Sequence, residues 1–232
     1  MVTSPLAARG AISSPLAVGA GGAAALPWWN PDGLTPAATC GAWRAKGAAS
    51  LAASYLRDGD LGHANIDPAV VGGVAPTFDP LVGWICDGTR WLTTGIAPAS
   101  TYSMLVQVSG LPGAGTQTPS GSYGGTSSNR YYFRGDGASV RYGYGSTSTL
   151  IGAVLVAGNI GLAANNAYRD GLFVGAVAGV WAAGTTAEIY LCAGNPQAAV
   201  GWLTGNISAA AIYNVTLTAP QVLARATAMS LL

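Results

Sequence analysis

The segment from Gly201 to Leu223 constrains the fold more than any other part of the chain, because it joins a long strand pattern to a capped helix. By the two-residue period of a strand, one side carries Ile207, Ala209, Ala211 and Tyr213, and the other carries Ser208, Ala210, Ile212 and Asn214. Both sides are small or apolar, so we expect this strand to be covered on both faces. Thr218 precedes Gln221 by three residues, which is the spacing of a capping box and predicts a closing helix.

Short strand patterns separated by Gly-, Pro- and Ser-rich turns fill the chain from Gly83 onward. The ranges that we predict as strands are 84–87, 90–94, 101–109, 129–135, 138–144, 150–157, 167–169, 172–178, 186–193 and 202–214. A short helix is expected between Ala48 and Arg57, where β-branched residues are absent. This pattern predicts an all-β fold, an antiparallel jelly-roll sandwich with a short C-terminal helix and an irregular N-terminal arm.

Several motifs follow one another along the chain, and the last is the Ile-Tyr-Asn strand end with its Leu-Thr-x-x-Gln cap. The earlier ones are Gly83-Trp-Ile-Cys-Asp-Gly88, Trp91-Leu-Thr-Thr-Gly95 and Ala167-Tyr-Arg-Asp-Gly-Leu-Phe-Val174. In this order they resemble a laminin-G-like (concanavalin A-like) jelly-roll domain over residues 40–232, which leaves residues 1–39 as an N-terminal arm and linker.

Two further segments, Lys46 to Tyr55 and Ala75 to Asp79, are similar to the version of this domain found in bacteriophage virion proteins. That resemblance implies a non-enzymatic structural protein of a phage particle, made in the host cytoplasm. It would decorate the capsid or form part of a tail or fibre, with other virion proteins as partners.

The composition excludes several classes of function. Only 8% of the residues are charged and the formal net charge is +1, which gives no positive field for gripping nucleic acid. The longest apolar tract, Leu172 to Gly184, is shorter than the ~20 residues that span a bilayer, so no membrane insertion is expected. So little charge promotes self-association, which predicts a homo-oligomer; a coding bias toward Ala and Gly is the alternative explanation.

Few residues could hold a metal ion. Cys40, Cys86 and Cys192 have no CxxC spacing, and we expect three buried thiols rather than a disulfide framework, as in a protein folded in a reducing cytoplasm. His63 is the only histidine, so a zinc site of the usual kind is not expected. The run Asp58, Asp60 and Asp67 lacks the further ligands of a calcium loop. We therefore predict no metal and no cofactor.

A catalytic role is also not expected. Glycanases of the fold that this chain resembles use a strand motif with two glutamates around an aspartate for retaining hydrolysis. They need two carboxylates because one attacks while another donates a proton. Glu188 is the only glutamate, and no carboxylate lies two or four residues from it. We predict that this chain is not an enzyme.

Carbohydrate binding is the alternative function, as an adhesion module on a virion or secreted by a bacterium, with a host surface glycan as partner. An Asp136-Gly137 turn would pair Phe133 with Val140 and Tyr131 with Tyr142 on one buried face. The opposite face would carry the candidate glycan-binding residues Arg130, Tyr132, Arg134 and Arg141. An aromatic ring beside planar donors suits a sugar. The competing interpretation is that most of these rings are core or subunit contacts.

Overall fold

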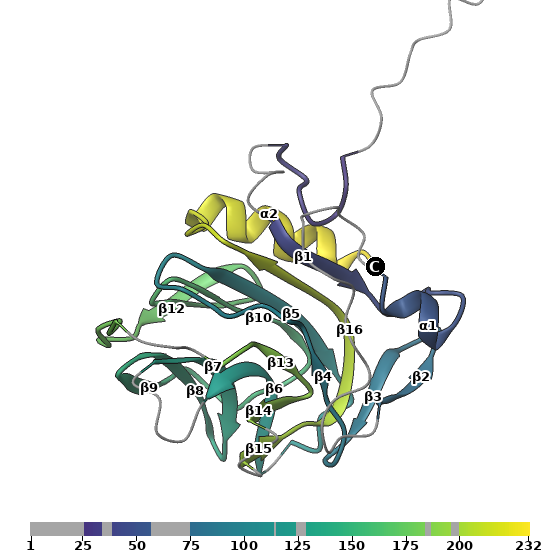
Figure 1. Cartoon of the computed structure of the whole chain (residues 1–232), viewed down its shortest axis with the longest axis horizontal. Coiled ribbons are helices and arrows are strands. Elements are labelled where there is room, and N and C mark those ends of the chain that lie inside the picture. Colours follow the sequence, from purple (N-terminus) through teal and green to yellow (C-terminus); the bar gives the residue numbers. More distant parts are fainter. Residues whose placement is uncertain are drawn as a thin grey trace, which may run out of the picture.

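The computed structural model describes residues 26–33, 39–56, 75–113, 115–123, 129–183, 187–195 and 200–232. Within these residues the strands form two antiparallel sheets that pack face to face, and one helix lies on the outside of the larger sheet (Figure 1). The predicted fold, an antiparallel jelly-roll sandwich with a short C-terminal helix, is confirmed. The division between an arm at 1–39 and a domain at 40–232 stays a prediction.

The larger sheet has eight strands in the order β12-β11-β10-β5-β16-β3-β2, and β1 also pairs with β16. The strands are β1 (Thr39–Arg44), β2 (Thr77–Asp79), β3 (Gly83–Asp87), β5 (Ser103–Ser109), β10 (Gly158–Ala163), β11 (Asn166–Arg169), β12 (Leu172–Ala176) and β16 (Thr204–Tyr213). The turn Asp170-Gly171 joins β11 to β12 with Arg169 opposite Leu172, as the sequence predicts.

The smaller sheet has six strands in the order β4-β13-β6-β7-β8-β9. They are β4 (Leu92–Thr93), β6 (Thr116–Tyr123), β7 (Arg130–Asp136), β8 (Ser139–Gly145), β9 (Thr147–Ile151) and β13 (Tyr190–Leu191). A separate hairpin of β14 (Ala193–Asn195) and β15 (Val200–Trp202) lies against β6 (Figure 1). The helices are α1 (Leu51–Ser54) and α2 (Ala219–Ser230), and α1 begins after Ser50, whose hydroxyl accepts a hydrogen bond from the Ala53 N–H.

Strand β16 lies at the centre of the larger sheet and is covered on both faces, as predicted. It pairs with β5 on one side, and with β3 and then β1 on the other. The register shifts between Ile207 and Ala209, so Ser208 forms a bulge. A bulge moves the residues before it to the opposite face. Ile207 therefore packs between the sheets with Ala210, and the prediction that it shares a face with Ala209 is wrong.

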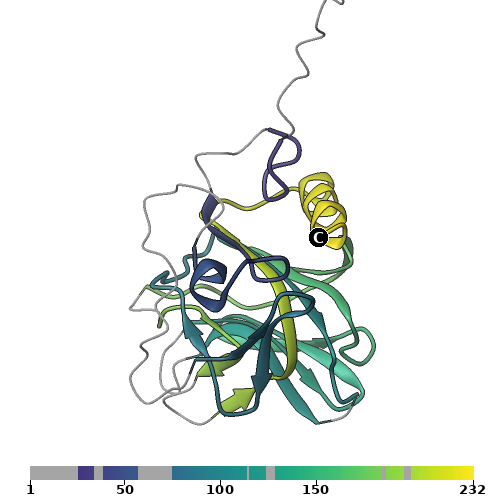
Figure 2. The same cartoon turned by 90° about the vertical axis from the view of Figure 1, so that its right-hand side faces the viewer.

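Helix α2 packs on the outer face of the larger sheet and holds residues 26–33 there (Figure 2). It begins after Thr218, whose N–H donates to Gln221 Oε1 at 2.9 Å, which confirms that half of the predicted capping box. Arg225 is fully buried on this helix. Its guanidinium contacts both carboxylate oxygens of Asp32, at 2.9 and 3.1 Å, and lies 5.1 Å from the ring centroid of Tyr213. The turn at residues 26–33 is thus fixed to α2.

Strands β1, β2, β6 and β10 lie outside the predicted ranges, and the sequences of β6 and β10 look like loops. Strand β6 reads Thr-Gln-Thr-Pro-Ser-Gly-Ser-Tyr, yet Ser120 and Ser122 are buried and donate to the carbonyls of Tyr190 and Ala187. Strand β10 contains two glycines. The predicted strand at 150–157 is wrong beyond Ile151, where β9 ends.

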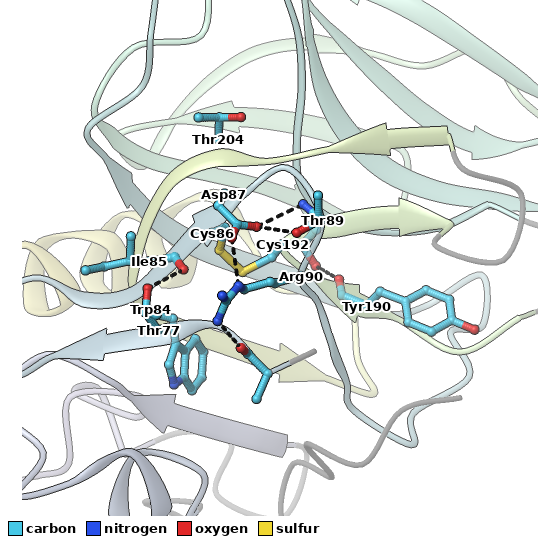
Figure 3. Close-up of a disulfide and its surroundings, with 12 residues drawn as sticks. Thr77, Trp84, Ile85, Cys86, Asp87, Thr89, Arg90, Tyr190, Cys192 and Thr204 are labelled. Atoms are coloured by element: carbon cyan, nitrogen blue, oxygen red, sulfur yellow. Dashed lines mark hydrogen bonds and ion pairs between the residues drawn. A yellow bond between two sulfur atoms is a disulfide. The ribbon is translucent and has the colours of Figure 1, made fainter. Parts of the chain in front are cut away.

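Cys86 and Cys192 form a disulfide between β3 and the residue after β13, with Cα atoms 5.8 Å apart (Figure 3). The prediction of three thiols is therefore wrong for this pair. The two cysteines are 106 residues apart, and only the sandwich brings them together, so spacing alone gave no signal. Cys40 is buried and takes part in no disulfide, and burial raises the pKa of its thiol.

Candidate ligand-binding face

The hairpin of β7 and β8 turns at Gly137-Ala138, one residue later than predicted. Phe133 therefore pairs with Tyr142 and Tyr131 with Tyr144, so the predicted partners Val140 and Tyr142 are wrong by two residues. Asp136 takes a strand position because its carboxylate binds the side chain of Arg141. A shift of two residues keeps every side chain on its face. The predicted division into a buried face and a polar face survives.

The outer face of the six-stranded sheet carries the candidate residues. Tyr132 lies between Gly121 on β6 and Gly143 on β8. A Cβ atom at Gly143 would lie 2.4 Å from Cε1 of the Tyr132 ring, so the ring lies across that glycine. Tyr132 is only 5% exposed. It thus supports its neighbours and does not present a free ring face to a ligand.

Two arginines pack on the tyrosines of this face. The Arg130 guanidinium lies 5.3 Å from the ring centroid of Tyr123, and the Arg134 guanidinium lies 5.7 Å from that of Tyr132. The two rings meet edge to face with centroids 5.6 Å apart. Such contacts hold a guanidinium in place and leave its edge free to donate hydrogen bonds. Sequence reasoning missed Tyr123 as the partner of Arg130 because it did not predict β6.

Asp136 joins Arg134 to Arg141. Its Oδ2 lies 2.7 Å from Arg141 Nε and 3.6 Å from Arg134 Nη2. The hydrogen bond from Arg141, followed by the charges of both arginines, lowers the pKa of Asp136 below its ordinary 3.8. Arg141 also approaches Ser148 Oγ on β9, at 3.5 Å. The outer surface of β7 and β8 therefore carries three guanidinium groups and one carboxylate, which contacts two of them. This surface, which we call the arginine face, is positive.

A small cavity lies where the β14–β15 hairpin approaches the arginine face. It has a volume of about 10 Å³, which is room for about one water molecule. The residues that line it are Thr118, Tyr123, Tyr132, Arg134, Gly194 and Gly201. Thr118 Oγ1 and Arg134 Nε are buried there without a hydrogen-bond partner. A sugar does not fit inside, so a ligand would contact the open part over β7 and β8.

The structure brings no metal site together in the residues it describes, since no three His, Cys, Asp or Glu side chains cluster there. His63, Asp58, Asp60 and Asp67 lie outside the described ranges. No helix in the described part of the chain is long and apolar enough to span a membrane.

Glu188 lies at the edge of the smaller sheet, where its carboxylate accepts a hydrogen bond from the Gly95 N–H at 3.0 Å. Its nearest tyrosine in the sequence is Tyr190, and some glycosidases use a tyrosine nucleophile. Burial, and then the Glu188 charge, raises the pKa of Tyr190. The phenol is therefore protonated at neutral pH, and this pair does not supply an activated nucleophile.

The sequence matches no protein-family model and no curated protein. Solved structures share the fold. Trypanosoma rangeli sialidase in complex with sialic acid has a TM-score of 0.55 and 13% identity, over 84% of this chain and 33% of that one. A mutant of this sialidase displaying trans-sialidase activity has a TM-score of 0.50 and 15% identity, over the same shares. This chain spans about a third of the sialidase length.

A smaller protein also resembles the chain. The CBM40 of the Ruminococcus gnavus IT-sialidase, bound to alpha2,3 sialyllactose, has a TM-score of 0.43 and 11% identity, over 56% of this chain and 84% of that one. At such identities the two sialidase similarities show the fold alone. The laminin-G-like and virion part of the resemblance stays a prediction.

Proposed function

We propose that this chain is a non-catalytic carbohydrate-binding module whose arginine face takes acidic glycans. The observation that carries the proposal is the gathering of Arg130, Arg134 and Arg141 on one sheet face, held by two tyrosines and opposed by the single carboxylate of Asp136. Planar guanidinium groups match carboxylate and sulfate groups with paired hydrogen bonds. Carbohydrate binding was the alternative function predicted from the sequence, and the fold of the neighbours is compatible with it.

Direct titration of the full chain with acidic and neutral glycans tests this proposal. Sialyllactose, a glucuronate-containing oligosaccharide and lactose serve as probes, because the first two carry a carboxylate that lactose lacks. We expect the acidic probes to bind at least about tenfold more tightly than lactose, since a hydrogen bond to a charged group contributes roughly 1.5–3 kcal/mol. Binding should weaken as salt rises.

The matched variants are Arg130→Ala with Arg141→Ala on the arginine face, and Arg90→Ala elsewhere. Arg90 pairs with Asp87 beside the disulfide (Figure 3), and neither residue belongs to β7 or β8. We expect the double variant to lose the preference for acidic glycans and Arg90→Ala to retain it. Equal affinity for all three probes, or equal loss in both variants, would contradict the proposal.

The place of this module on a phage particle remains a proposal that rests on the sequence resemblance from Lys46 to Asp79. The homo-oligomer is a proposal that rests on the low charge of the chain, whereas contacts with other virion proteins rest on the same sequence resemblance. Mass spectrometry of purified particles tests the first, and light scattering of the purified chain tests the second. Recovery of the chain only from culture medium would favour the secreted alternative.

A further inference from the structure

A cavity between the two sheets lies apart from the arginine face. It has a volume of about 210 Å³ and lies where the edge strands β9 and β12 meet. Its walls are mostly aliphatic and come from both sheets and from the connection that follows β9; they include Val140, Tyr142, Ile151, Val154, Val156 and Val174. Apolar cavities of about 150 Å³ bind benzene, so this one has room for a somewhat larger molecule.

Arg169 and Asp170 are the charged residues of this mostly aliphatic wall. Arg169, whose side chain is 18% exposed, lines the cavity at the end of β11. Its Nη2 donates to the carbonyls of Val156 and Ala157, which fixes the guanidinium. Its Nη1 is buried and has no hydrogen-bond partner in the structure. A buried donor without a partner is unfavourable, so an acceptor from a ligand would improve the site.

The charge of this guanidinium is already balanced. Asp170 Oδ2 lies 3.6 Å from Arg169 Nε, and Asp170 Oδ1 accepts the Asn159 N–H at 2.7 Å. Gly158 leaves the space for that carboxylate, because a Cβ atom there would lie 2.4 Å from Asp170 Oδ1. A second carboxylate in the cavity would face Asp170 and carry an uncompensated charge. The site therefore favours a neutral acceptor.

We propose that this cavity binds a compact, neutral, largely apolar molecule with one hydrogen-bond acceptor, which receives the free N–H of Arg169. A small aromatic or cyclic ketone has this chemistry. The apolar body would lie between Val140 and Val174, and the oxygen would reach the guanidinium at the end of β11.

Three probes of nearly equal size separate the parts of the proposal. Acetophenone has a neutral acceptor, ethylbenzene has none, and benzoate is charged. Methyl NMR of the full chain, observed at Val140, Ile151 and Val154, reports binding at the cavity itself. We expect saturable shifts with acetophenone, at least about tenfold weaker binding of ethylbenzene, and binding of benzoate no tighter than that of ethylbenzene.

Variants test the site. Val174→Trp fills the cavity from the edge strand and should abolish saturable shifts. Leu172→Trp, on the same strand but 62% exposed and outside the lining, should leave them unchanged. Arg169→Met should lower the affinity for acetophenone to that for ethylbenzene, without changing the affinity for ethylbenzene. If that variant does not fold, the two tryptophan variants and the three probes still test the proposal. No shifts with any probe, tightest binding of benzoate, or equal affinity of acetophenone and ethylbenzene would overturn the proposal.

Discussion

At the scale of single residues, Arg225 carries the only ion pair in the described part of the chain with a fully buried member. Asp32 contributes the other charge, and its side chain is 18% exposed. The sequence around Arg225 does not predict this burial, because an arginine in a surface helix normally faces water. Its partner Asp32 lies 193 residues away in the sequence, and only the tertiary structure brings the two together.

Arg225→Met should lower the free energy of unfolding by about 3–5 kcal/mol, because it leaves the Asp32 carboxylate without its guanidinium. Urea unfolding measures the loss. Arg90→Met is the control, since the Arg90–Asp87 pair is partly exposed and such pairs contribute about 0–1 kcal/mol. Losses of equal size in the two variants would show that the buried pair contributes no more than the surface pair.

The contribution of Asp136 to the stability of the fold should decrease as the pH falls. Its pKa in the folded chain lies below the ordinary 3.8, with the Arg141 hydrogen bond as the largest cause. Its contribution to stability is therefore present above that ordinary value and is lost as the pH falls below it. In a carboxyl NMR titration, Arg141→Met should raise the pKa of Asp136, whereas Arg130→Met should leave it nearly unchanged. If neither substitution changed the pKa of Asp136, the ion pair between Asp136 and Arg141 would be contradicted.

At the scale of elements, the sequence predicted the helices, strands and turns that are specified by the spacing of neighbouring residues. The cap at Thr218 followed from spacing, and so did the Asp170-Gly171 hairpin. Strand β6 did not, because its stability comes from serine hydroxyls that bind distant carbonyls. The bulge at Ser208 also escaped, since it depends on β1 and β3 sharing one side of β16. The composition of the arginine face was predictable, whereas the burial of Tyr132 required the two flanking glycines to be placed in register.

The disulfide is the covalent link between elements, and its reduction should cost about 2–5 kcal/mol of unfolding free energy. The double variant Cys86→Ala with Cys192→Ala should lose the same amount of unfolding free energy, and reductant should then have no further effect on its stability. Cys40→Ala should keep the sensitivity to reductant, because Cys40 is not part of the disulfide. Thiol titration of the unfolded, unreduced chain should find one thiol, and three after reduction. Three thiols without reductant would disprove the bond.

At the scale of the whole molecule, the sandwich depends on strand β16, which contributes side chains both to the core between the sheets and to the cluster under α2. It also joins β5 to β1 and β3. A chain ended at Trp202 lacks this strand and should show no cooperative thermal transition by near-ultraviolet circular dichroism. A chain ended at Leu217 keeps β16 and lacks only α2, so it should keep a transition at a lower temperature. A cooperative transition in the shorter chain would show that the smaller sheet folds by itself.

The anchoring of residues 26–33 on α2 has a consequence for how the molecule is displayed. Helix α2 covers one side of the sandwich, and the arginine face lies on the opposite side, with both sheets between them (Figure 1). If the residues before Leu26 attach the chain to a larger body, that attachment leaves from the helix side. The arginine face would then point outward, toward whatever the body meets.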